Sequence, residues 1–255
     1  MAFILVVTDT ASFNIPYPLS MFKECKLCGT VQIGESIFSH TGIKLRINRS
    51  DVSLTGDLAY SNLTPINGDI MGPFRFFPME CSHGIVSMKH NVRGEIMLNG
   101  EKWAFENGVG YIETDSGVSF PEKYTWVHSN DFSGRGDASI MAAVAKIPFM
   151  GFYFWGCICV VLVDGKAYRL ATYKGVKILR CERNLLILKQ GKYKLTVRIS
   201  AAHKQTAQRL AAPKRGIMSR IIKESPSCTA HFLFTKNGRT IFAGQSLHAS
   251  YEYCF

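Results

Sequence analysis

Apolar and polar residues alternate at short period over most of the chain. A period of two is typical of β-strands that bury one face. Asn-Gly or Asp-Gly separates neighbouring runs at 99–100, 164–165 and 237–238, which is the sequence form of a two-residue hairpin turn. The clearest alternating runs are GEIMLNGEKWAFENG, KAYRLATY, KYKLTVRIS and RTIFAGQSLHASYEY. The pattern predicts an all-β fold of antiparallel strands.

Closure of these hairpins into one or two barrels is the expected architecture, because closure removes exposed sheet edges and can enclose an apolar ligand. With 255 residues, 47% of them hydrophobic, the chain can bury a core as one large domain or two small ones. No glycine-rich loop opens a helix, and neither G-x-S-x-G nor H-E-x-x-H occurs. These absences exclude the usual nucleotide-binding, serine hydrolase and zinc protease classes.

One apolar segment, IPFMGFYFWGCICVVLV at 147–163, is the only candidate for a membrane span. It barely reaches the length that a spanning helix needs, and Pro148, Gly151 and Gly156 interrupt it. Its aromatic and β-branched residues favour one or two buried strands instead. The N-terminal MAFILVVTDT lacks the basic residues of a secretory signal. We therefore expect a cytoplasmic protein.

The net charge of +11 suggests an anionic neighbour, either a nucleic acid or an acidic membrane surface. The eight cysteines show no repeated spacing of a zinc site or a disulfide framework, so we expect a reduced, intracellular chain. The one Cys-x-x-Cys, Cys25 to Cys28, is interpreted as two ordinary strand cysteines. A metal knuckle is the alternative, although structural zinc requires four ligands.

Candidate chemistry gathers between 110 and 132, in GYIETDSGVSFPEKYTWVHSNDF. In an extended chain, one face carries Tyr111, Glu113 and Asp115, and a second strand carries Tyr124, Trp126, His128 and Asn130 on one face. If both faces point inward, carboxylates, an imidazole, an amide and aromatic rings meet in one ligand site. The competing interpretation is a solvated polar face, against which the large aromatic rings argue.

The stretch GIVSMKHNVRGEIMLNGEKWAFENGVGYIETDSGVSFPEKYTWVHSNDF resembles the central signature of the tocopherol cyclase-like family. The similarity continues through MAAVAKIPFMGFYFWGCICVVLVDGKAYRLATYKGVKI and LAAPKRGIMSRIIKES, and so covers nearly the whole chain. The chain departs from the family pattern at Ser116, where Trp is usual, at Val118, where a basic residue is common, and at His128, where Gln is usual. These departures favour a binding protein without turnover.

The resemblance implies two lipocalin-like antiparallel β-barrels or sheets, related to the carotenoid-hydratase type. We place the first within 1–80 and the second within 81–255, with strands that the two can share. The region before 80 is shorter than in most members, which predicts a first barrel without its initial strand or two.

The implied reaction is ring closure of a prenylated quinol, or a related prenyl lipid, to a chromanol, which makes the protein an isomerase without redox cofactor or metal. An acid protonates the prenyl double bond, a surface stabilises the tertiary cation, and the phenol oxygen attacks it. The alternative is an apolar ligand-binding barrel that performs no chemistry.

On this basis Asp115 is the first choice for the acid and Glu113 the second, because burial and a neighbouring carboxylate raise a carboxyl pKa. Trp126 and Tyr124 are expected to hold the cation through their ring faces. His128 and Asn130 are expected to orient the quinol, and His128 to take the phenol proton. Tyr111, His83 and His90 are further candidates for ligand binding. The structural alternatives are that the carboxylates accept hydrogen bonds from the backbone, that Trp126 only packs in the interior, and that His83 stabilises the fold.

A small hydrophobic substrate or ligand is thus the expected partner. The basic residues from Lys189 to Lys223 are interpreted as a solvated face, or as a peripheral contact with a membrane surface, where a quinol would reside. No motif of interleaved basic and aromatic residues supports a nucleic acid. The oligomeric state does not follow from the sequence.

Overall fold

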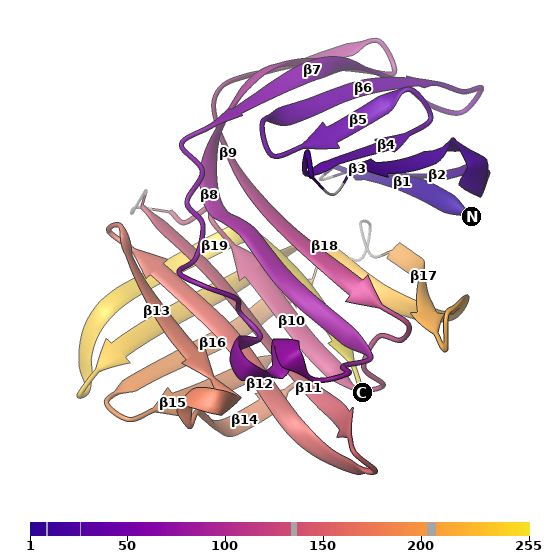
Figure 1. The fold of residues 1–255 in the computed structure, drawn as a ribbon. Coiled ribbons are helices and arrows are strands. Elements are labelled where there is room, and N and C mark those ends of the chain that lie inside the picture. Colours follow the sequence, from indigo (N-terminus) through magenta and orange to yellow (C-terminus); the bar gives the residue numbers. More distant parts are fainter. Residues whose placement is uncertain (9, 26, 134–136, 203–207) are drawn as a thin grey trace. The chain divides into compact units, whose positions relative to one another are not determined.

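The computed structural model describes residues 1–8, 10–25, 27–133, 137–202 and 208–255 (Figure 1). In this part of the chain there are nineteen β-strands and three short 3-10 helices, and no α-helix. The paired strands within each sheet run antiparallel. The prediction of an all-β, antiparallel fold is therefore confirmed.

The chain forms two compact units. The first comprises Met1–Pro65 and Lys89–Ile112, and the second comprises Ile66–Met88 and Glu113–Phe255. The long strands β8 (Cys81–Leu98) and β9 (Glu101–Gly117) contribute residues to both. The boundary expected between 80 and 81 falls inside a segment of the second unit.

In the first unit, β1 (Ala2–Val7) pairs with β2 (Ser12–Tyr17), and a 3-10 helix, η1 (Leu19–Met21), follows. A second sheet runs in simple sequence order up to β8 and β9. Its earlier strands are β3 (Phe22–Cys25), β4 (Thr30–Ile33), β5 (Ser36–Ser39), β6 (Gly42–Asn48) and β7 (Ser53–Ser61). The buried core of this unit includes Ile4, Ile15, Leu45, Ile47 and Leu54.

The second unit contains a ten-stranded sheet. Its main path is β13-β12-β11-β10-β19-β18-β16-β15-β14, and β17 pairs with β18 off this path. The strands are β10 (Tyr124–Ser129), β11 (Ala138–Phe149), β12 (Phe152–Val163), β13 (Lys166–Ala171), β14 (Lys177–Glu182), β15 (Leu185–Gln190), β16 (Tyr193–Ala202), β17 (Gln208–Lys214), β18 (Ile217–Lys236) and β19 (Arg239–Cys254). The 3-10 helices are η2 (Gly72–Phe76) and η3 (Thr172–Lys174).

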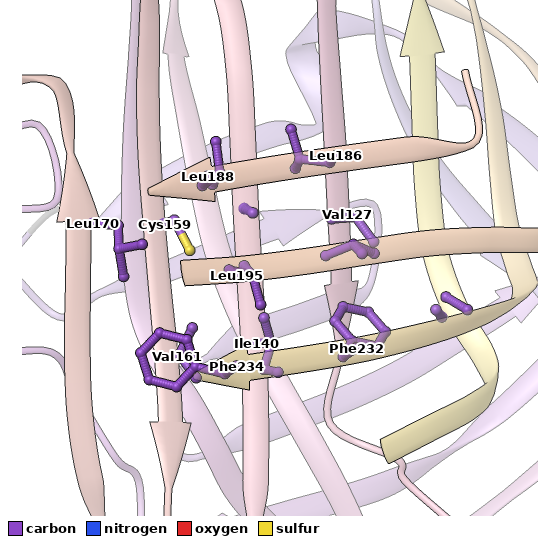
Figure 2. Packing of buried hydrophobic residues seen from close by; sticks show 14 of the residues in the cluster. Val127, Ile140, Cys159, Val161, Leu170, Leu186, Leu188, Leu195, Phe232 and Phe234 are labelled. Carbon is purple, nitrogen blue, oxygen red and sulfur yellow. The ribbon is translucent and has the colours of Figure 1, made fainter. Parts of the chain in front are cut away.

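This sheet curls around its own core, so that strands far apart in the sheet order share one hydrophobic cluster. In Figure 2, Val127 and Ile140 lie in the same cluster as Leu188 and Leu195, whose strands run across the first pair. Alternate residues enter this core, as predicted: Val127 in β10, Ala138, Ile140, Ala142 and Val144 in β11, and Cys157, Cys159, Val161 and Val163 in β12. The residues between them point to the opposite face of the sheet.

The predicted hairpin turns are confirmed. Asn99, Asp164 and Asn237 have φ angles of 50°, 49° and 50°, and a glycine with positive φ follows each. Two successive residues with positive φ define the turn that matches the twist of the flanking strands. The 147–163 segment forms the end of β11 and all of β12, as expected for strands. Among the described residues, no helix is long and apolar enough to cross a membrane.

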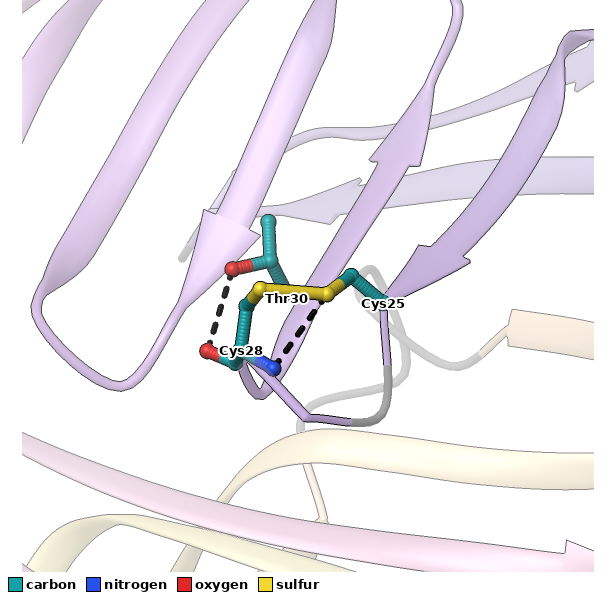
Figure 3. The surroundings of a disulfide bond; sticks show 3 residues. All are labelled: Cys25, Cys28 and Thr30. Atoms are coloured by element: carbon teal, nitrogen blue, oxygen red, sulfur yellow. Dashed lines mark hydrogen bonds between the residues drawn. A yellow bond between two sulfur atoms is a disulfide. The ribbon is translucent and has the colours of Figure 1, made fainter.

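The Cys-x-x-Cys is a disulfide, which corrects the expectation of ordinary reduced cysteines at this site. Figure 3 shows Cys25, the last residue of β3, bonded to Cys28, whose backbone N–H also donates to Cys25 Sγ at 3.2 Å. The Cα atoms of the two cysteines lie 5.3 Å apart, within the usual range for a disulfide. Lys26 and residues 203–207 of the basic 189–223 region lie outside the described residues. The free cysteines are Cys81, Cys157, Cys159, Cys181, Cys228 and Cys254.

Candidate functional site

A large cavity lies in the second unit, on the face of β10, β11 and β12 that alternation turns away from the buried core. The cavity and its open mouth together hold about 910 Å³ of space unoccupied by protein atoms, part of which is open to solvent. The lining residues are Met71, Phe74, Met79, Cys81, His83, Glu113, Asp115, Phe120, Pro121, Tyr124, Trp126, Ala143, Ala145, Ile147, Phe154, Gly156, Cys157, Ile158, Thr172, Tyr173 and Glu252. Most of them are apolar or aromatic.

One polar wall of the cavity is a histidine held between two carboxylates. His83 Nδ1 lies 2.8 Å from Asp115 Oδ1, and His83 Nε2 lies 3.3 Å from Glu113 Oε2. The first contact is a hydrogen bond, and the second is an ion pair without good hydrogen-bond alignment. Burial alone would lower the pKa of His83, but the hydrogen bonds and charges of Asp115 and Glu113 outweigh it and raise the pKa to about 10. The cluster therefore holds a proton at neutral pH.

The cluster depends on strand alternation and on a close approach of β8 to β9. Glu113 and Asp115 are two residues apart in β9 and share a face, as predicted. Gly84 follows His83, and a Cβ atom at this position would lie 2.7 Å from Thr114 Oγ1. A side chain at residue 84 would therefore require the Thr114 hydroxyl to move, beside the point where His83 contacts the carboxylates.

A second polar wall is formed by β10 and β19. Tyr124 Oη donates to Glu252 Oε2 at 2.5 Å. Burial raises the pKa of Tyr124 far above its usual value, and the charge of Glu252 raises it further, so the phenol stays neutral and donates. In the register of the two strands, Trp126 lies directly opposite Glu252. Trp126 Nε1 is buried and has no hydrogen-bond partner among the described residues.

Aromatic residues and a fixed loop complete the enclosure. The rings of Phe74 and Phe154 stack with centroids 5.5 Å apart. Tyr173 Oη donates to the carbonyl of Ile70 at 2.9 Å, which fixes the segment that precedes η2. On another side, the guanidinium of Arg220 in β18 donates to the carbonyls of the loop that carries Phe120 and Pro121. These contacts hold apolar walls in place around the polar groups.

Four of the predicted site residues do not line this cavity. His128 shares a strand face with Tyr124 and Trp126 but is buried beyond the cavity, 3.4 Å from Ser139 Oγ, and burial lowers its pKa to about 3. Asn130 follows β10 and is partly buried. His90 and Tyr111 belong to the first unit.

His90 has a packing environment of its own. Its ring lies 4.5 Å from the ring of Tyr60, centroid to centroid, and burial lowers its pKa. A Cβ atom on Gly110 would lie 2.1 Å from His90 Nε2, so only glycine fits at that position without a shift of the ring. The motif residues His90 and Gly110 are therefore explained by packing within the first unit.

Several residues that line or hold the cavity were not predicted from the sequence. Glu252 lies in ASYEY, where alternation separates it from Tyr251 and Tyr253, and this pattern was the available signal. Phe74 and Tyr173 carry no local signal, since they reach the cavity from 3-10 segments. Among the described residues, no group of three or more His, Cys, Asp or Glu side chains is arranged to hold a metal ion.

Comparison with solved structures supports the fold. The crystal structure of kievitone hydratase from Nectria haematococca superimposes with a TM-score of 0.50 at 12% identity, over 84% of this chain and 65% of that chain. The crystal structure of CghA gives a TM-score of 0.52 at 10% identity, over 89% of this chain and 68% of that chain. At such identities the likeness concerns the fold alone. The predicted lipocalin-like, all-β architecture is confirmed.

Sequence comparison identifies the family. A stretch of 103 residues, 39% of this chain, is 32% identical to the protein named "Probable tocopherol cyclase, chloroplastic" from Oryza sativa subsp. japonica. The match spans only 22% of the rice protein. The family model described as tocopherol cyclase-like matches residues 58–253, which is most of the chain. The chain therefore belongs to the tocopherol cyclase-like family.

Proposed function

We propose that this protein closes the ring of a prenylated quinol, or a related prenyl lipid, by acid catalysis in the cavity of the second unit. The observation that carries the proposal is the His83 cluster, a proton held by one imidazole and two carboxylates on the wall of a mostly apolar, aromatic cavity. An apolar enclosure suits a prenyl chain, and the few polar groups in its walls fix which end of the ligand meets the proton.

Asp115 is the proposed proton donor. Its carboxyl takes the proton from His83 across the 2.8 Å contact and delivers it to one carbon of the prenyl double bond. The other carbon becomes a tertiary cation. Glu113, on the opposite nitrogen of His83, keeps the imidazole oriented toward Asp115 and offsets its charge. After the transfer, the cluster takes up another proton from solvent.

The aromatic lining is proposed to stabilise the cation until the ring closes. Trp126 and Tyr124 face the cavity from β10, and Phe74 and Phe154 face it from two other segments. A cation over an aromatic face that is shielded from water gains about 2 kcal/mol. These rings carry no nucleophile that competes with the phenol oxygen, with the exception of Tyr124, whose hydroxyl is occupied by Glu252.

The phenol oxygen of the substrate then forms the new C–O bond and loses its proton. Glu252 lines the cavity and is the proposed acceptor, with Tyr124 as the donor that positions its carboxylate. One proton enters at carbon and one leaves from oxygen, so substrate and product have the same mass. His128 has no part in this scheme, because it lies outside the cavity lining.

The alternative is a binding protein without turnover. The observation that favours it is that both carboxylates face the same imidazole, so that the proton is held within a stable ion-paired cluster. In that case the cavity holds a prenyl lipid while the cluster serves only to orient its polar head.

The test is incubation of the purified protein with a prenylated benzoquinol, followed by chromatographic separation of the isomeric chromanol. We expect product from the wild type and a loss of about 100-fold or more in Asp115→Asn, which is the usual contribution of a positioned acid. Asp164→Asn is the matched control, because Asp164 is exposed in a hairpin turn that Asn also favours. Saturable tryptophan quenching without product would favour the binding protein. The absence of both product and quenching would exclude prenylated quinols as the substrate class.

A further inference from the structure

The ends of β11 and β12 form a hairpin that extends beyond the strands on either side. The ladder of β10 with β11 reaches only to Ala145, and the ladder of β12 with β13 begins at Ile158. Between these limits, Lys146 to Phe149 pair with Phe152 to Trp155. Four residues in each arm correspond to a projection of about 13 Å. Figure 1 shows this hairpin reaching past its neighbours in the second unit.

The tip of the hairpin exposes large apolar side chains. Met150 and Phe152 are each 79% exposed, Tyr153 is 62% exposed and Trp155 is 45% exposed. In η2, which packs beside the hairpin through Phe74 and Phe149, Phe76 is 76% exposed. A contiguous exposed group of this kind marks an interaction site, because single exposed apolar residues are normal but clusters are not.

This exposed group is continuous with the cavity. The ring of Phe149 lies 6.1 Å from the ring of Phe74 and 6.1 Å from that of Phe154, centroid to centroid, and both of these residues line the cavity. Phe77, which is partly exposed, lies 5.4 Å from Phe149 on the same side. An apolar path of aromatic rings therefore runs from the hairpin to the cavity wall.

Basic residues accompany the aromatic ones. Lys146 Nζ lies 4.4 Å from the ring centre of Tyr153, and the guanidinium of Arg75 lies 4.5 Å from that of Phe76. The backbone N–H of Lys146 donates a hydrogen bond to the carbonyl of Lys123. Lys123 is exposed and follows the acidic residue Glu122 in the chain. The hairpin from 146 to 155 contains no acidic residue. Aromatic rings at the apolar end with lysine and arginine behind them are typical of proteins that enter a lipid headgroup layer.

We propose that the β11–β12 hairpin, with Phe76 and Phe77, inserts into the surface of an anionic lipid bilayer and that the cavity receives its lipid there. The occupant is a bilayer rather than a protein because the projection is narrow and exposes large apolar side chains at its tip with Lys146 behind them, and because the chain carries a net charge of +11. Docking itself does not depend on catalysis. Only the transfer of lipid into the cavity rests on the function proposed above.

The experiment is flotation of the protein with vesicles of phosphatidylcholine that contain phosphatidylglycerol. We expect the wild type to float, and the double variant Met150→Ser/Phe152→Ser to bind about tenfold or more weakly, since it removes two exposed apolar side chains. Leu27→Ser is the control, because Leu27 is fully exposed in the other unit. Binding of the wild type is also expected to fall in vesicles of phosphatidylcholine alone and in high salt.

A wild type that does not float, or a double variant that floats as well as the wild type, would overturn the proposal. The proposal is also overturned if the wild type does not float but forms a concentration-dependent dimer, and the double variant abolishes that dimer. Tryptophan quenching by the quinol in detergent separates this proposal from the function, because neither Met150 nor Phe152 lines the cavity. Normal quenching by the double variant, with slowed uptake from vesicles, supports docking. If the quinol does not quench the tryptophans of the wild type, the proposed function is contradicted. Flotation still decides whether the hairpin docks on a bilayer.

Discussion

His83 keeps its proton at a pH where an exposed histidine has lost it, because a carboxylate faces each of its ring nitrogens. Its pKa is raised to about 10, and its side chain is only 11% exposed. A proton bound more tightly in the folded state than in the unfolded state stabilises the fold. This contribution is complete below the unfolded pKa of about 6.5 and is lost as the pH rises through the folded pKa.

We therefore predict that the protein loses stability between about pH 6.5 and pH 10, and that His83→Gln removes much of this loss. The difference in pKa sets an upper limit of about 5 kcal/mol, at about 1.4 kcal/mol for each pKa unit. The measurement is urea unfolding of both proteins at several pH values. Because tyrosines and lysines also titrate in this range, the difference between the two proteins is the relevant quantity. Parallel curves for the two would contradict the assignment of the proton to His83.

The sequence indicated the two carboxylates and named His83 as a candidate for ligand binding, but not as the partner of the carboxylates. Alternation alone places Glu113 and Asp115 on one face of a strand, whatever the fold. His83 lies more than two dozen residues earlier, and its position opposite Asp115 depends on the register of β8 and β9, which no local pattern specifies. The same limit explains His128. It shares a strand face with Trp126, as predicted, but it lies outside the cavity lining.

At the scale of elements, Arg220 connects β18 to the loop that forms one wall of the cavity. Its Nη1 donates to the carbonyls of Phe120 and Pro121, and its Nη2 donates to the carbonyl of Glu122 and to Cys254 Sγ. A planar guanidinium can serve several acceptors at once, whereas a lysine ammonium cannot match this geometry. Arg220 is thus a positioning residue for the loop.

We predict that Arg220→Lys costs about 1 kcal/mol in stability, because partly buried acceptors lose their donors, and that it weakens ligand binding. The two measurements are thermal unfolding and tryptophan quenching by the prenylated quinol. Arg180→Lys is the matched control, since Arg180 forms an exposed pair with Glu182. Unchanged quenching with reduced stability would show that the loop does not shape the cavity.

Hairpins were the elements that local sequence specified best. Asn-Gly and Asp-Gly turns are local events, and each occurs where it was predicted. The segment at 147–163 was predicted as strands, but its sequence did not indicate which face would meet the cavity. Trp126 and Ile147 turn toward the cavity while Val127 and Val144 enter the core, a choice made by the curl of the whole sheet.

At the largest scale, the second unit depends on a sheet order that is not sequential. β10 pairs with β19, the last strand, and this pairing brings Glu252 opposite Trp126. Contacts of this sequence separation leave no local signal, so neither the strand order nor the second polar wall followed from the sequence. The family resemblance supplied the architecture, and the pairing of distant strands supplied the site.

A side chain rather than a ladder connects the end strand β13 of the curled sheet to β15, the strand next to the sheet's other end. Gln190 in β15 accepts a hydrogen bond from the backbone N–H of Ala171 in β13 at 3.0 Å and donates to the carbonyl of Arg169 at 3.1 Å. The edge of an unpaired strand has backbone N–H and C=O groups that need hydrogen-bond partners. The side-chain amide of Gln190 supplies an acceptor and a donor to β13, as a neighbouring strand would.

We predict that Gln190→Ala destabilises the protein by about 1–3 kcal/mol, because a partly buried donor and acceptor lose their partner, and that the Ala171 amide exchanges faster with solvent. Gln190→Glu keeps an acceptor for Ala171 but loses the donor to Arg169, so its effect should be intermediate if closure depends on both bonds. Gln245→Ala is the control, because the carbonyl of Gln245, rather than its side chain, bonds Ser133. Hydrogen exchange and urea unfolding measure the two effects. Unchanged exchange at Ala171 would mean that β13 is protected by packing against the core alone, and that the sheet is held closed by Leu170 and Leu188 rather than by the glutamine.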